Sequence, residues 1–146
     1  MSCSYEFDPE AHDSTSVENR WSCPHEQHDS SDYCPFHMEP KDRAAAGIDR
    51  EELTAEVVRN LNDNNDTTRS FIGAHFPELD FDYVEIENDN EHPIDFRHTT
   101  IPGGISVFHG RFEEQLDLRH STVGGFNADN CDFENGVLCT GTRFTD

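Results

Sequence analysis

Lysine is almost absent from this sequence of 146 residues. Lys41 is the only lysine among ten basic residues, which face 31 aspartates and glutamates and leave a formal net charge of −21. Depletion of lysine with enrichment of carboxylates is expected in molar salt, where the Debye length falls to about 3 Å and self-repulsion is screened. We therefore interpret the acidity as halophilic adaptation. The alternative is an acidic surface that mimics nucleic acid or binds a basic partner.

Long apolar runs are absent as well. No stretch approaches the ~20 apolar residues that a membrane-spanning helix needs, so we expect no membrane insertion. Residues 1–6 have neither a basic start nor an apolar core, so we expect no signal peptide and a cytoplasmic location. In that compartment the five cysteines favour metal ligands or free thiols over disulfides. No basic patch is present, so we expect no direct binding of nucleic acid.

Cysteine and histidine gather in residues 1–40, which are polar and lack apolar periodicity. Two residues separate Cys34 from His37, the spacing at which a tight turn directs two ligands at one ion, as in a zinc knuckle. The predicted ligands are Cys3, Cys23, Cys34 and His37, with His25 or His28 as alternates to Cys3. Because a polar segment of this length has no core, we expect structural Zn²⁺ to stabilise its fold. Otherwise the segment is a disordered tail.

A catalytic metal would need an open coordination position and a nearby general base. Four protein ligands close the coordination sphere, and the sequence carries no nucleophile–base pattern. We therefore expect a protein that is not an enzyme. An uncharacterised enzyme with a catalytic metal is the third of the three functions considered.

Residues 41–73 are predicted to form a linker and one short helix. Asp49 can cap the helix N-terminus with Glu52 three residues later, which is a capping box. The apolar residues that then share one face are Leu53, Val57 and Leu61. A helix of about a dozen residues is marginal alone, so we expect it to pack as a cap on the region that follows.

Residues 74–146 repeat with a period of five, which neither a helix nor a strand produces. The stretches 79–86, 94–101 and 116–123 share the rhythm apolar–acidic–apolar followed by two further residues. We count units of five from Ala74 and place two extra residues at 104 and 105. In this frame the central residues, and those two positions earlier, are mostly apolar or small.

This frame assigns polar as well as apolar residues to inward positions. Ser106 lies two residues before the central Phe108, and Leu138 and Arg143 are themselves central residues. The charged inward pairs are Asp89 with Glu91 and Arg111 with Glu113. An apolar core cannot hold such residues unpaired, so we expect these two charged units to bulge out as loops.

The unit 131–135, Cys-Asp-Phe-Glu-Asn, closely follows the small–Asp/Asn–Leu/Phe–x–x pattern of the pentapeptide-repeat family. The segment 74–145 resembles that family, and with the Cys/His start the chain resembles its haloarchaeal members. The resemblance implies a mainly β fold, a right-handed quadrilateral β-helix in which four units form one coil. The chain would hold about three and a half coils. The alternative is an irregular all-β sandwich.

The resemblance implies a rigid scaffold or protein-interaction module, adapted to high salt, with a protein partner of unknown identity. The runner-up is an acidic DNA mimic that binds DNA gyrase, as the quinolone-resistance pentapeptide proteins do. No cap is predicted at the C-terminal end of the β-helix. Either that end pairs with a second copy, a homodimer like those that some pentapeptide proteins form, or the chain is shorter than its relatives.

Two matched Arg-His pairs lie 22 residues apart, which is one coil of twenty plus the two extra residues. The pairs are Arg97-His98 and Arg119-His120. We expect them to stack on one face, where they could bind an anion or an acidic partner. The alternative is that Asp95 and Asp117 neutralise them as a surface ladder.

Overall fold

The computed structural model describes residues 2–12, 14–62, 69–86 and 93–145. In the N-terminal part, β1 (Glu6–Phe7) pairs with β2 (Trp21–Ser22) in an antiparallel hairpin, and a 3-10 turn (Pro9–Ala11) lies between them. Two helices follow, α1 (Pro40–Ala45) and α2 (Arg50–Leu61). None of the helices in these ranges has the length and apolar character needed to cross a membrane.

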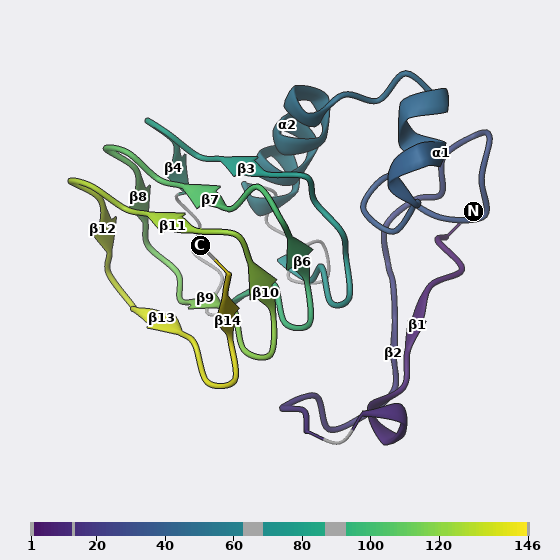
Figure 1. Ribbon diagram of the computed structural model, residues 1–146, viewed down its shortest axis with the longest axis horizontal. Helices are drawn as coiled ribbons and strands as arrows, with labels where there is room; N and C mark the ends of the chain where they lie inside the picture. Colours follow the sequence, from purple (N-terminus) through teal and green to yellow (C-terminus); the bar gives the residue numbers. More distant parts are fainter. Residues whose placement is uncertain (1, 13, 63–68, 87–92, 146) are drawn as a thin grey trace.

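The rest of the described chain forms short parallel strands, which we call the parallel array (Figure 1). The strands are β3 (Leu79–Asp80), β4 (Glu85–Ile86), β5 (Ile94–Asp95), β6 (Thr100–Ile101), β7 (Ile105–Ser106), β8 (Arg111–Phe112), β9 (Leu116–Asp117), β10 (Thr122–Val123), β11 (Phe126–Asn127), β12 (Asp132–Phe133), β13 (Val137–Leu138) and β14 (Arg143–Phe144). They form four three-stranded parallel sheets. Successive strands visit the four sheets in a fixed order, so four consecutive strands make one coil. This pattern is consistent with a β-helix.

The array spans three coils, preceded by two isolated parallel bridges. Ser70 bridges to Asp95 and His75 bridges to Thr100, so the ladder begins before the first strand of the array. The described strands therefore pass three times through the four sheets, and the ladder begins before Ala74, where the predicted repeat starts.

The frame predicted for the second coil is wrong by one residue. Ile105 and Val107 are the buried residues of this unit, whereas Ser106 and Phe108 are only partly buried. The two extra residues do not sit together at 104 and 105. One precedes Ile105 and the other lies in the connection between β8 and β9. This arrangement buries apolar side chains in place of polar ones, which is the favourable choice.

The same shift overturns the predicted loop at Arg111 and Glu113. Arg111 lies in β8 with its side chain exposed, and Phe112 takes the buried position. The Arg111 guanidinium forms an ion pair of 2.6 Å with Glu134 of the next coil. The other unit predicted to bulge, which contains Asp89 and Glu91, lies outside the described residues.

The last coil also departs from the predicted frame. Arg143 pairs with Thr122, and Phe144 pairs with the buried Val123, so Phe144 and not Arg143 occupies the central position. Leu138 pairs with Asp117, which places it on a polar position of the repeat. A further extra residue between β12 and β13 causes this shift.

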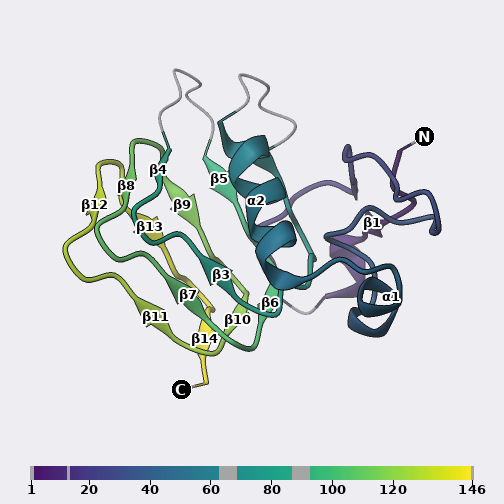
Figure 2. The same ribbon diagram turned by 90° about the horizontal axis from the view of Figure 1, so that it is seen from above.

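The helix α2 begins and packs as predicted. The Asp49 side chain accepts a hydrogen bond of 2.8 Å from the backbone N–H of Glu52, and Leu53, Val57 and Leu61 are buried. Figure 2 shows α2 on the side of the first coil that faces the N-terminal part. The helix α1 was not predicted, although Pro40 at its first turn is a recognised start signal.

The N-terminal part covers the same end of the array. A single core joins Cys34 and Phe36 to Leu53 of α2 and to Phe71 and Phe76 ahead of the first strand. The backbone N–H of His75 donates to the carbonyl of Phe36 at 3.0 Å. Residues 2–39, which we call the knuckle, therefore cap the array together with α2.

Candidate metal centre

The structure brings together the four residues predicted as metal ligands. One ligand atom from each of Cys3, Cys23, Cys34 and His37 lies within 4.8 Å of the others, and the three cysteines are buried. Two sulfurs, those of Cys23 and Cys34, are 3.7 Å apart. His37 Nδ1 lies 3.2 Å from the Cys34 sulfur and 3.8 Å from the Cys3 sulfur.

These distances fit a tetrahedral zinc ion. With Zn–S of about 2.3 Å and Zn–N of about 2.0 Å, the ligand atoms of a tetrahedron lie roughly 3.5 to 3.8 Å apart. Three of the six ligand-atom pairs lie 3.2 to 3.8 Å apart, close to those values, and all six pairs lie within 4.8 Å. Three thiols and one imidazole are also the donor set that structural zinc prefers. The residues therefore form a possible metal-binding site.

The hairpin explains how Cys3 reaches a ligand twenty residues away. The β1–β2 pairing continues toward the chain start, where the backbone N–H of Cys3 donates to the carbonyl of His25 at 2.8 Å and that of Cys23 donates to Tyr5 at 3.0 Å. Antiparallel pairing therefore places Cys3 beside Cys23. The long spacing between Cys3 and Cys23 is therefore the length of the β1–β2 hairpin and its loop.

A tight turn supplies the other two ligands. The backbone N–H groups of His37 and Met38 both donate to the carbonyl of Cys34, at 3.0 and 3.1 Å. This turn folds His37 back over Cys34, as the two-residue spacing predicted.

The environment of His37 fixes its ring for metal binding. His37 Nε2 lies 2.8 Å from the carbonyl oxygen of Ile72. A carbonyl can only accept, so Nε2 carries the proton and Nδ1 presents a lone pair to the thiols. The Tyr5 ring stacks on the imidazole with centroids 4.0 Å apart and an interplanar angle of 12°. The ligand is therefore held in the tautomer and orientation that a metal needs.

The predicted alternates to Cys3 lie outside the cluster. Nε2 of His25 lies 2.9 Å from the carbonyl of Ser70, so His25 instead joins the knuckle to the array. Nδ1 of His28 lies 2.8 Å from the Ser30 hydroxyl. Among the residues described, no second group of three or more such ligand atoms lies as close together as the Cys₃His set.

The three thiols perturb one another strongly. Hydrogen bonds from Cys23 and Cys34 hold the pKa of Cys3 far below its usual range. The pKa of Cys23 is raised, first because it donates to Cys3 and then because it donates to Cys34, with burial adding to the shift. Without a cation, ionisation of one thiol therefore opposes ionisation of its neighbours. A bound metal ion would hold all three as thiolates.

A buried arginine lies beside this cluster. Arg43 on α1 is 3% exposed and donates to the carbonyl of Pro35 at 3.1 Å and to the carbonyl of His75. Burial lowers the pKa of Arg43, whereas the negative charge of the Cys34 thiolate raises it. Zn²⁺ with three thiolates and a neutral imidazole carries a net charge of −1. Arg43 is the counter-charge that such a centre requires.

Sequence reasoning missed Arg43 and Tyr5. Neither residue belongs to a ligand-spacing pattern. Arg43 lies on α1, which was not predicted, and Tyr5 reaches His37 only because the hairpin folds. The short Pro40-initiated helix after the knuckle was the one available signal for Arg43.

The Arg-His pairs lie on one face of the array, as predicted. The His98 and His120 rings stack with centroids 5.1 Å apart and an interplanar angle of 12°. Arg97 and Arg119 form ion pairs of 2.7 Å with Asp95 and Asp117. Cys131 and Cys139 are free thiols away from the Cys₃His set.

Comparisons with known proteins found no matching family model, no matching curated protein and no matching solved structure.

Proposed function

We propose that this chain is a non-enzymatic protein-interaction module in which a structural zinc ion secures a cap on a β-helix. One observation carries the proposal. The four ligands of the candidate centre come from the protein itself, so they leave no open position for a substrate or an activated water. Such a centre stabilises the fold, and it has no open coordination position at which a substrate could react.

The contacts around the centre support a structural role. His25 and His37 each use Nε2 to bond a carbonyl just ahead of the array, at Ser70 and Ile72. The knuckle is therefore also fastened to the start of the array at two points, one of them the candidate ligand His37. The metal would fix the knuckle, and the knuckle would cover the apolar end of the first coil.

The array supports the interaction role. Its strands are two residues long and, from β5 to β14, start four to six residues apart, a regularity that favours flat and rigid faces. We propose that it is a right-handed quadrilateral β-helix of the pentapeptide-repeat type, and that the protein partner binds one of its faces. The high negative charge would keep these faces hydrated in molar salt.

A second copy is the proposed occupant of the C-terminal end of the array. In the described chain β11 to β14 each have a neighbour on one side only. Phe144 is 45% exposed there, and Phe126 and Phe133 are only partly buried. Open strand edges beside apolar side chains favour self-association. Light scattering should report a dimer that Phe144→Asp converts to a monomer, and a wild-type monomer at high protein concentration would contradict this part of the proposal.

Cobalt substitution tests whether the centre is closed. The protein loaded with Co²⁺ should show the absorption of a tetrahedral cobalt–thiolate centre, and added azide or cyanide should leave the spectrum unchanged, because all four positions are protein ligands. A spectrum that shifts and saturates with azide would indicate an open position. That result would contradict the structural role and favour a catalytic metal.

A further inference from the structure

The array contains the same charged corner twice, in successive coils. We call Asp95, Arg97 and His98 the first step, and we call the equivalent residues of the next coil the second step. The second step consists of Asp117, Arg119 and His120. Each arginine Nε donates to its aspartate at 2.9 Å, and each Nη2 donates at 2.7 Å. Both histidines have positive φ, 57° and 62°. The two steps are therefore nearly identical receptors.

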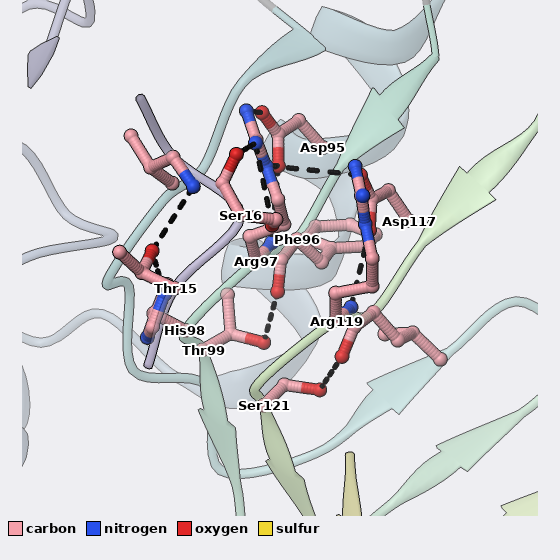
Figure 3. A network of polar contacts seen from close by, with 12 residues as sticks. Thr15, Ser16, Asp95, Phe96, Arg97, His98, Thr99, Asp117, Arg119 and Ser121 are labelled. Carbon is pink, nitrogen blue, oxygen red and sulfur yellow. Dashed lines mark hydrogen bonds and ion pairs between the residues drawn. The ribbon is translucent and has the colours of Figure 1, made fainter. Parts of the chain in front are cut away.

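The first step is occupied by the protein's own chain (Figure 3). The loop between β1 and β2 reaches the array there. Arg97 Nη1 donates to the carbonyl oxygen of Ser16 at 3.0 Å. The Thr15 hydroxyl lies 2.7 Å from His98 Nε2. Val17, which follows Ser16, is buried in a small cluster with Phe7. The first step thus binds, through one hydroxyl and one backbone carbonyl, a segment that bends at Ser14 and Ser16, where the Thr15 hydroxyl also accepts from the backbone N–H of Val17 at 3.0 Å.

The second step offers the same atoms without an occupant from the described chain. The Arg119 side chain is 31% exposed, against 19% for Arg97. Within the described ranges, Arg119 Nη1 and His120 Nε2 have no hydrogen-bond partner. The His120 ring is nevertheless held in place, because it stacks on His98 and lies against Gly141 of the third coil. Its position therefore does not depend on a ligand.

The charges of the two steps determine what they can bind. Asp95 and Asp117 are buried, and each pairs with the arginine of its own step, so the face carries no surplus positive charge at neutral pH. Arg97 Nε also lies 3.7 Å from Asp117. An added anion would meet these carboxylates at close range. The observations favour a neutral ligand over the anion considered from the sequence.

We propose that the second step is a docking site for a short, bent peptide segment of a partner protein. A serine or threonine hydroxyl of that segment bonds to His120 Nε2, and the next carbonyl oxygen accepts from Arg119 Nη1. The chain's own Thr15 and Ser16 are the template for this recognition. The inference rests on the proposed role as an interaction module and names one face and one partner chemistry for it.

The test is a titration of the full-length, metal-loaded protein, followed by side-chain NMR of arginine and histidine. The probe is a peptide with the sequence of residues 14–17, which has no charged side chain, acetylated and amidated and added to about 10 mM, where a complex with a dissociation constant of that order is half formed. The tethered segment keeps the first step filled through its high effective concentration. Saturable shifts are expected at Arg119 and His120.

Variants and modified probes sharpen this test. A peptide with valine in place of the threonine should bind roughly 3- to 10-fold more weakly, because one hydrogen bond is lost. Arg119→Lys keeps the charge beside Asp117 but loses the forked donor, and His120→Asn tolerates the positive φ but loses Nε2. The double variant should lose the binding, followed at the backbone amides of residues 117–121, which wild type and variant share. Arg111→Lys, on another sheet, is the matched control and should retain it.

The proposal is overturned if the wild-type protein shows no shift at Arg119 and His120, if the valine peptide binds as tightly, or if the double variant binds normally. It is also overturned if inorganic phosphate binds the second step more tightly than the peptide, since the site would then select anions. None of these outcomes bears on whether the metal centre is closed. Conversely, azide binding to the cobalt protein would leave the peptide result unchanged.

Discussion

The N-terminal segment, residues 2–46, and the parallel array achieve burial by different means. In the array, each buried ring contacts another one coil away: Phe112 lies between Phe81 and Phe133, with centroids 5.6 and 5.3 Å distant. In the N-terminal segment, three of the buried side chains are the cysteines of the candidate metal centre. Loss of one contact in the array is therefore a local defect, whereas loss of one ligand removes the element on which the whole segment depends.

The largest effect is expected from Cys34→Ser. Structural zinc contributes an apparent binding free energy of about 10–16 kcal/mol in small zinc modules, so its loss should unfold residues 2–46. Hydrogen exchange should show the knuckle amides exchanging freely while amides of the second and third coils stay protected. Cys139→Ser is the matched control, because Cys139 is exposed and outside the cluster. A mutant knuckle that remains protected would show that the metal is not needed.

Phe112→Ala should destabilise the array and leave the metal centre intact. Phe112 is fully buried, and its truncation should lower the free energy of unfolding by about 3–5 kcal/mol through lost transfer energy and a cavity. Metal content should not change. Denaturant unfolding followed by circular dichroism measures the loss. Tyr83→Ala, at a position that is 71% exposed, should cost less than about 1 kcal/mol. Equal losses for the two variants would mean that the coils are not packed as described.

Arg43→Met tests the link between the two regions. It removes the counter-charge of the centre and the hydrogen bonds to the carbonyls of Pro35 and His75, but it keeps most of the buried volume. Outer-shell partners of metal ligands are typically worth about 10- to 100-fold in affinity, and a loss of that size is expected. Competition with a chromogenic chelator measures it. Lys41→Met, next to α1's first residue, removes an exposed charge and should change nothing.

Much of this architecture was predictable from the sequence. The period of five, the α2 capping box and the Cys34–His37 spacing each depend on near neighbours in the chain. The corner residues were harder to place. An extra residue at a corner changes the free energy of folding little, so the local sequence does not fix its position. Only the burial of Ile105 and Phe112 shows where the extra residues lie. Arg43 and the contact of Thr15 with His98 depend on how distant segments meet, which no local pattern records.

The smallest effect concerns the loop that joins the two regions at the first step. Burial, with the nearby positive charges of His12, His120 and Arg97 adding to it, lowers the pKa of His98 to about 4. A base whose pKa is lowered by docking favours the docked state while it is neutral. That advantage is present above pH ~6.5 and declines as the pH falls through 6.5 towards 4.

Amide exchange of the loop around Thr15 should therefore accelerate between pH 7 and pH 4.5, after correction for intrinsic rates. In His98→Asn, which accepts the φ of 57°, this acceleration should be absent. An unchanged pH profile in the variant would assign the effect to another group.

The central claim is that a metal ion bound by Cys3, Cys23, Cys34 and His37 holds the cap on the array. X-ray absorption at the zinc edge, on protein purified in about 3 M KCl, tests it most directly. The account predicts one zinc per chain with three sulfur ligands and one nitrogen ligand at the usual distances of about 2.3 and 2.0 Å. Metal-free protein with a fully protected knuckle, or zinc bound mainly by oxygen, would contradict it.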